Sequence, residues 1–236
     1  NSVSGFRATN LSELSSHGVN EETKRLEIWN ANLEDEQNIH LELSIEDSSE
    51  HFELFGNACY KKVNDYIFIA PTYEFIEDSS VFVYTPVDAK LYGGEAGFHL
   101  HPHPIDWLHL ETSLALVIGE RDNGESLPFL PATSFTNTLR TEFDSFKWFS
   151  NNYSFITVKS TGEQNKISDF ETSTSGYTLV SAGFGGTVMI EKVPLEIRVS
   201  GNNLFDKNYV SHLSRLKTDG IANMGRNISV GIQTKF

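Results

Sequence analysis

Apolar side chains recur at every second position through most of this sequence. In the stretch IHLELSIE, residues 39–46, isoleucine and leucine hold the odd positions, and histidine, glutamate and serine hold the even ones. The stretches WLHLETSLAL, LEIRVSG and RNISVGIQTKF alternate in the same way. Such alternation is typical of β-strands with one apolar and one polar face, and helical periodicity is scarce.

The pattern predicts an all-β fold, an antiparallel up-and-down meander of about ten strands. The expected strands are residues 2–8, 36–48, 51–69, 88–101, 105–119, 134–145, 152–162, 176–189, 194–205 and 225–236. In 152–162 and 176–189 both faces mix apolar and small polar residues, so the facing of these two strands stays open.

The connections between these strands alternate in length. Residues 48–50, 102–104, 146–151 and 190–193 are short connections, and 9–35, 70–87, 120–133, 163–175 and 206–224 are long ones. In a meander, alternate connections lie at opposite ends, so all short turns fall at one end and all long loops at the other. Transmembrane β-barrels have this asymmetry, with short periplasmic turns and long extracellular loops.

A soluble β-sandwich that binds carbohydrate or protein is the alternative. The barrel is favoured because several strands reach the roughly 9–11 residues that a tilted membrane span needs. The last residue, Phe236, is also in phase with the apolar face. Aromatic residues near the short turns suggest a girdle at the lipid interface. They are Trp107, Phe143, Phe146, Trp148, Phe149 and Tyr153.

Charged residues within the strands indicate which face lines the water-filled lumen. A lysine or arginine on the lipid face at mid-membrane costs about 2–4 kcal/mol. Arg140 and Arg198 alternate with apolar neighbours, so we expect them to face the lumen. The same reasoning predicts lumen-facing acidic groups at Glu42, Glu111, Glu142 and Glu196.

Composition excludes several classes of function. The net charge of −14 opposes nucleic-acid binding, and the single cysteine, Cys59, excludes an internal disulfide. No apolar run reaches the roughly 18 residues of a membrane helix, and the first residues do not form a signal peptide. The sequence contains none of the common catalytic motifs, so we expect no enzyme.

Several motifs, in order along the chain, resemble those of TonB-dependent outer-membrane receptors. They are WNANLEDE (the family's G-N-x-x-L-x-x-E, with Trp29 at the usual glycine), DAKLYGGEAG, LPFLPAT, SGNNLFDKNYVSHLS and GRNISVGIQTKF. The resemblance implies a 22-stranded barrel around an N-terminal plug, of which residues 1–236 supply about the last ten strands. The plug and the first strands would be absent, so this piece alone is expected as an open sheet or a non-native closure.

The family's known partners follow from the resemblance. It implies contact with outer-membrane lipid, work with the TonB complex through the missing plug, and uptake of a scarce ligand across the outer membrane of a Gram-negative bacterium. The final strand, with Gly231 and the terminal Phe236, resembles the signal that the outer-membrane insertion machinery reads.

The loops look most like those of zinc-uptake receptors within this family. The implied cargo is zinc or an iron chelate, with no permanently bound cofactor. His17 lies near Glu13 and Glu21 in an acidic loop, and His212 lies in the last long loop. Imidazole and carboxylate groups suit zinc. These four residues are therefore the candidate metal ligands, and the alternative is ordinary histidines in acidic, solvated loops.

Half of the eight histidines lie in GFHLHPHPIDWLHLE, residues 97–111. Pro102 and Pro104 predict a tight turn at the periplasmic end, with His99 and His109 facing each other across the lumenal side of the hairpin. Because this end is far from where a receptor captures its ligand, we interpret the segment as a proline-set turn in a wet lumen. The metal hypothesis therefore moves to His17.

Overall fold

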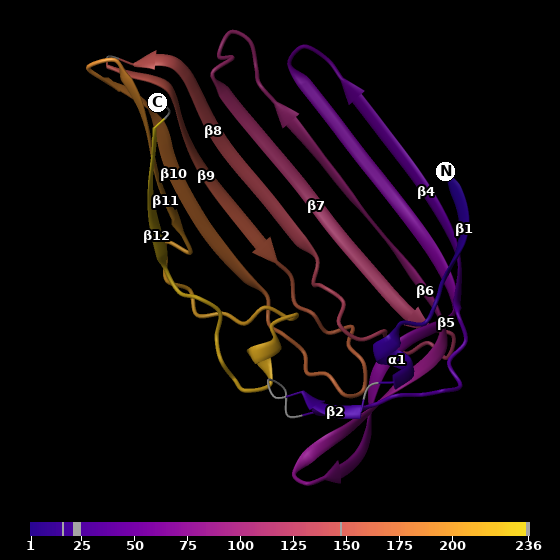
Figure 1. Ribbon diagram of the computed structural model, residues 1–236. Helices are drawn as coiled ribbons and strands as arrows, with labels where there is room; N and C mark the ends of the chain where they lie inside the picture. Colours follow the sequence, from indigo (N-terminus) through magenta and orange to yellow (C-terminus); the bar gives the residue numbers. More distant parts are fainter. Residues whose placement is uncertain (16, 21–24, 147, 235–236) are drawn as a thin grey trace.

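Ten strands follow one another in a single curved sheet through the described part of the chain (Figure 1). The structure, a computed structural model, describes all residues except 16, 21–24, 147 and 235–236. The strands are β1 (Ser2–Arg7), β4 (Glu36–Ser48), β5 (Phe52–Ile76), β6 (Ser79–Leu100), β7 (Leu108–Arg121), β8 (Ser134–Phe146), β9 (Phe149–Thr161), β10 (Tyr177–Ile190), β11 (Val193–Asn202) and β12 (Asn227–Thr234). Each pairs antiparallel with its neighbours, and β1 and β12 form opposite edges of an open sheet. The predicted antiparallel meander is confirmed.

The connections segregate by length as the sequence indicates (Figure 1). We call the end with the β4–β5, β6–β7, β8–β9 and β10–β11 connections the short-turn end, and the opposite end the long-loop end. The β6–β7 connection is longer than the predicted tight turn, since it occupies residues 101–107 between the strands. In the described part of the chain, no helix is long and apolar enough to cross a membrane.

The predicted long loop at residues 70–87 is wrong. β5 continues to Ile76 and β6 begins at Ser79, so the two strands extend beyond the sheet as a ribbon (Figure 1). The ribbon turns at Glu77 and Asp78, both of which have positive φ. Apolar positions continue through this segment because one side of the ribbon packs on other loops, burying Val81 to 2% exposure.

The first long loop is also partly ordered into regular structure. It contains a short helix, α1 (Leu11–Ser15), and two strands, β2 (His17–Asn20) and β3 (Arg25–Ile28). β2 pairs antiparallel with β3, and β3 pairs parallel with the extended part of β6. The loop is thereby fixed to the ribbon by backbone hydrogen bonds.

The strand register divides the side chains into two faces, because directly paired residues point to the same side of a sheet. The apolar face carries Ile39 and Leu43 of β4, which are 54% and 75% exposed. At the other edge it carries Val230 of β12, 67% exposed and paired with Val199. The polar face carries the residues between them. A row of exposed apolar side chains across the sheet is the expected outer surface of a membrane barrel.

The register also resolves the facing of β9 and β10. Ile156 pairs with Leu139 on the apolar face, whereas Phe155 pairs with Arg140 on the polar face. Phe155 also lies opposite Gly183, and a Cβ added there would lie 2.7 Å from the ring.

Two further rings of β9 cover glycines of β10 in the same manner. Tyr153 covers Gly185, and Phe149 covers Gly186, again with 2.7 Å between the ring and an added Cβ. Gly185 pairs with Arg198, so Tyr153 faces the lumenal side and does not belong to the predicted lipid girdle. Phe149 pairs with Val188, which pairs with Leu195, so Phe149 lies on the apolar face as the girdle prediction requires. Trp107 and Phe143 remain at the short-turn end, with ring centroids 5.0 Å apart.

The buried apolar residues gather at the long-loop end. Most of those under 9% exposure belong to the loops and to the ribbon or the adjoining parts of β5 and β6. They are Leu26, Leu33, Val63, Ile67, Phe68, Val81, Phe82, Ala89 and Leu127. The membrane-spanning part is one layer thick, so its apolar side chains face outward. The molecule's core is thus the packed assembly of loops.

We predict that Gly183→Ala destabilises the full-length receptor by about 1–3 kcal/mol, because the new methyl group overpacks against the Phe155 ring. Urea unfolding in detergent, followed by heat-modifiable gel mobility, measures the change. Gly5→Ala is the matched control, since its Cβ would meet only Asn38 at 3.9 Å. Equal effects of the two variants would contradict the ring-over-glycine packing.

Candidate functional site

Three long loops pack against one another at the long-loop end. The amide of Phe129, in the β7–β8 loop, donates a hydrogen bond to Glu171 Oε1 in the β9–β10 loop at 3.0 Å. Gln164 donates to the carbonyl of Leu130 at 3.0 Å. These hydrogen bonds join the β9–β10 loop to the β7–β8 loop, so contacts within the chain hold the two loops together.

His212, in the β11–β12 loop, is at the centre of this contact. The residue is 9% exposed. Its Nδ1 lies 2.8 Å from the Thr174 hydroxyl and its Nε2 lies 3.4 Å from Glu171 Oε1. Lys217 Nζ lies 3.2 Å from the same Nδ1 and also donates to the carbonyl of Thr172. The imidazole therefore joins two loops and stands between a carboxylate and an ammonium group.

The surroundings of His212 shift its protonation equilibrium. Burial lowers the pKa of His212, the Lys217 ammonium lowers it further, and Glu171 partly opposes both effects. Burial also lowers the pKa of Lys217. A neutral imidazole at neutral pH keeps a lone pair for a hydrogen bond or a metal ion.

A cavity of about 510 Å³ opens beside this histidine. Its lining combines cationic, acidic and aromatic groups from four separate segments. They include Arg25, Glu27, Phe129, Phe170, Glu171 and His212. The guanidinium of Arg25 stacks over the Phe82 ring at 4.5 Å, which holds it at the edge of the loops. The cavity has the size and mixed lining of a small-molecule site.

The other predicted metal ligands are placed differently. Glu13 is 7% exposed and accepts hydrogen bonds from Arg7 at 2.9 Å and from the amide of Asn10. Arg7 also binds Glu36 at 2.7 Å, so one guanidinium joins β1, α1 and β4. Among the described residues, the cavity lining does not include Glu13. The backbone of His17 lies in β2, while its side chain and Glu21 lie outside the described residues.

The charged residues expected in the lumen lie on the polar face by register. Arg140 donates to Glu111 Oε1 at 3.1 Å and contacts Glu142. Arg198 donates to Glu196 at 2.7 Å. Glu42, on β4, pairs with Cys59 on the same face. Neighbouring charges of opposite sign thus offset one another across β7 and β8 and along β11.

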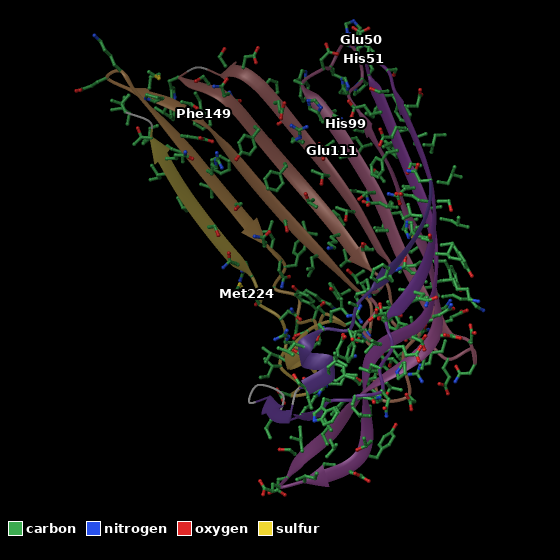
Figure 2. All side chains as sticks on the ribbon, turned by 45° about the vertical axis from the view of Figure 1, so that its right-hand side comes forward. Glu50, His51, His99, Glu111, Phe149 and Met224 are labelled. Carbon is green, nitrogen blue, oxygen red and sulfur yellow. The ribbon has the colours of Figure 1, made fainter. Side chains whose placement is uncertain are left out.

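The histidine-rich segment is more crowded than the sequence suggests. His99 Nε2 lies 2.9 Å from His109 Nδ1, so the proposed contact across the hairpin forms. A further histidine, His51, which directly precedes β5, lies beside His101. Sequence reasoning missed His51, although the short turn after β4 places it opposite the end of β6. Figure 2 shows His51, His99 and Glu111 together near the short-turn end, away from Met224.

The two proposed assembly residues lie in the last strand or beyond it. Gly231 pairs with Arg198 in the β11–β12 ladder, and a Cβ there would meet only Arg198 Cβ at 3.9 Å. Phe236 lies outside the described residues. The role of both in assembly stays a prediction.

A single open sheet with an apolar outer face, a charged polar face and ordered long loops defines the wall of an outer-membrane β-barrel. Among the described residues no second sheet packs across it, so the soluble sandwich is excluded. A sequence model described as "TonB dependent receptor-like, beta-barrel" matches residues 3–204. The chain belongs to the TonB-dependent receptor family, whose members are outer-membrane transporters and not enzymes.

Solved structures of this family have the same fold. The copper transporter OprC is similar over 98% of this chain and 36% of its own, with a TM-score of 0.81 and 19% identity. The ferric yersiniabactin receptor FyuA from Yersinia pestis is similar over 100% and 34%, with a TM-score of 0.69 and 15% identity. The FrpB iron transporter from Neisseria meningitidis (F5-1 variant) is similar over 89% of this chain and 33% of its own, with a TM-score of 0.66 and 13% identity.

The chain thus spans about a third of the length of the structures it matches. A search of the curated proteins finds no match. At these identities the likeness shows the fold, and the cargo has to be argued from this chain's own residues.

We predict that the packing of residues 203–226 weakens as pH falls. The folded pKa of His212 is lowered, so its stabilising contribution is present above the unfolded pKa of about 6.5 and is lost as pH falls below that value. Amide hydrogen exchange, corrected for intrinsic rates, should show less protection in this segment at about pH 5 than at about pH 7.5. In His212→Gln the pH dependence should disappear. An unchanged pH response in that variant would contradict the assignment to His212.

Proposed function

We propose that this chain forms part of the barrel wall and of the extracellular mouth of a TonB-dependent receptor. The receptor imports a transition-metal ion or a metal chelate. The main observation that supports this proposal is the loop cavity beside His212 and Glu171. Its histidine and carboxylate suit a metal ion, while Arg25 and the aromatic rings of Phe129 and Phe170 suit an anionic chelate with a planar ligand.

Two features support a cargo of this kind. The similar structures include proteins named as a copper transporter and as a ferric yersiniabactin receptor. The acidic chain, with a net charge of −14, attracts cations toward the outer surface.

The proposed mechanism assigns separate tasks to the two ends of the sheet. The long loops capture the cargo, and the polar face lines the path through the membrane. We place the plug and the first strands of the barrel outside residues 1–236, so the TonB complex would act through a part that this chain does not contain. The apolar face contacts lipid, and the last strand with Gly231 and Phe236 engages the insertion machinery.

Zinc is the specific cargo that we propose. Zinc takes four nitrogen, oxygen or sulfur ligands in a tetrahedron. His17, Glu21 and His212 offer such ligands from the long loops, and further ligands would come from the plug. Glu13 is the least suited of the proposed ligands, because its carboxylate already binds Arg7 and the Asn10 amide.

Growth of a strain that lacks the full gene tests the class of cargo. Under zinc limitation the deletion strain should grow more slowly than its parent, and the intact gene should restore growth. The same two strains are also compared under copper limitation and under iron limitation, so that a growth defect under either condition identifies copper or iron as the cargo. Equal growth of both strains under all three limitations would reject metal uptake.

The loop ligands are tested on the purified full-length receptor. We predict that His17→Ala and His212→Ala each weaken zinc binding at least about tenfold, since each removes one ligand, worth about 1.4 kcal/mol or more. Isothermal titration calorimetry measures the affinity. His40→Ala, which alters a histidine of the polar face away from the loops, should leave it unchanged. Unaltered affinity in His17→Ala would remove that residue from the site.

A further inference from the structure

Four imidazoles and a carboxylate converge on the polar face at the short-turn end. The β5–β6 register pairs Glu53 with His99, and one step further the amide of His101 donates to the carbonyl of His51 at 3.0 Å. Alternation places all four side chains on the same face. β7 adds His109 from the neighbouring strand, and its ring stacks on that of His99. We call His51, Glu53, His99, His101 and His109 the imidazole cluster.

The rings of the imidazole cluster form a continuous set of contacts. Ring centroids of His99 lie 5.1 Å from those of His101 and of His109. The rings of His51 and His101 lie 5.7 Å apart, edge to face. Four imidazoles at these spacings place several ring nitrogens around one small volume.

Ligand atoms of Glu53, His99 and His101 all lie within 4.8 Å of one another. In a tetrahedral zinc site, with bonds of about 2.0–2.1 Å, neighbouring ligand atoms are about 3.3 Å apart. Rotation of the Glu53 side chain and the two rings can close this difference without a change in the backbone register. The strands therefore already hold three ligands near a metal-binding arrangement.

His109 can fix the tautomer of His99. When His99 donates from Nε2 to His109 Nδ1, 2.9 Å away, its Nδ1 presents a lone pair toward Glu53 Oε2 at 3.5 Å. Metal-bound histidines commonly have their second ring nitrogen held by such a hydrogen bond.

His51 gives an independent indication of a ligand-binding site. Its Nδ1 atom is buried and has no hydrogen-bond partner among the described residues. The nearest carboxylate, that of Asp106, is 4.0 Å away. A buried polar atom without a partner costs about 1–3 kcal/mol, and a bound cation, or water on a cation, removes that cost.

The surrounding charge favours a cation. Asp106, Glu111 and Glu142 surround the imidazole cluster, and Arg140 is engaged by the last two. The single cysteine, Cys59, is eight positions along β5 from His51, about 26 Å at the rise of a strand. Imidazole and carboxylate ligands without thiolate select borderline divalent ions such as Zn²⁺ and Cu²⁺ over Cu⁺.

We propose that His51, Glu53, His99 and His101 form a binding site for a borderline divalent cation at the short-turn end of the polar face, with His109 as its positioning residue. The site is separate from the cavity in the long loops, at the opposite end of the sheet (Figure 2). In the orientation proposed above it lies where an imported ion leaves the barrel. Binding by these residues does not require that the same ion be the receptor's cargo.

Electron paramagnetic resonance of Cu²⁺ added to the metal-free, full-length receptor tests this proposal. We expect a signal with nitrogen hyperfine splitting from more than one imidazole, which the combined variant His99→Ala/His101→Ala loses. Zn²⁺ added first should suppress the same signal, and this arm separates a shared site from one that takes copper alone. His40→Ala is the matched control, because it removes a polar-face histidine outside the imidazole cluster, and should retain the signal.

Folding of each variant is checked by heat-modifiable mobility. If the combined variant does not fold, His101→Gln and Glu53→Gln replace it, and each should weaken Cu²⁺ binding by at least about tenfold. His109→Ala should weaken binding about 10–100-fold, and His109→Gln, whose amide oxygen still accepts a hydrogen bond, should restore part of it.

An unchanged spectrum and stoichiometry in the folded cluster variants would overturn the proposal. So would the absence of imidazole-type binding in the unaltered receptor. The loop variants His17→Ala and His212→Ala distinguish this outcome from failure of the proposed uptake function. They should leave the cluster signal intact, even where they reduce growth on limiting metal.

Discussion

Backbone hydrogen bonding in lipid is the constraint on which this structure depends. No water reaches the bilayer core, so each strand has to satisfy its N–H and C=O groups with its neighbours. A sheet one layer thick then has no interior of its own in the membrane. The apolar side chains face outward, and the closely packed residues around Val81 and Leu127 lie in the ribbon and the long loops. In the membrane-spanning part, the apolar side chains therefore lie on the surface, whereas in the part beyond the membrane they are buried.

The long loops are anchored by few but well-placed polar contacts. Arg7 binds Glu13 and Glu36, and Glu36 also accepts a hydrogen bond from the amide of Ile67 at 2.8 Å. β3 adds a backbone connection to the ribbon, and His212 joins the last loop to the one before it. A loop surface supported in this way can be rigid even though it extends beyond the sheet.

The sequence predicts the meander and its segregated connections because alternation directly reflects a two-faced strand. It does not reveal the ribbon at residues 70–87, since one side of that segment packs on β3, which comes from a distant part of the chain. The facing of β9 and β10 stays ambiguous for a related reason. Phe155 is apolar yet belongs to the polar face, where it covers Gly183. His51 is a single histidine in the sequence and becomes part of a cluster only through the strand register.

The aromatic rings that cover glycines of β10 on the polar face make the lumenal wall apolar at one place and charged at others. Tyr153 and Phe155 form a hydrocarbon strip on the lumenal wall. The paired charges of Glu111 with Arg140 flank it on one side, and those of Glu196 with Arg198 flank it on the other. A hydrated ion moving along this wall would keep its water near the charged rows. Under the proposed uptake function, the flat organic part of a chelate would instead contact the aromatic strip, so an ion and a chelate would follow different parts of the same wall.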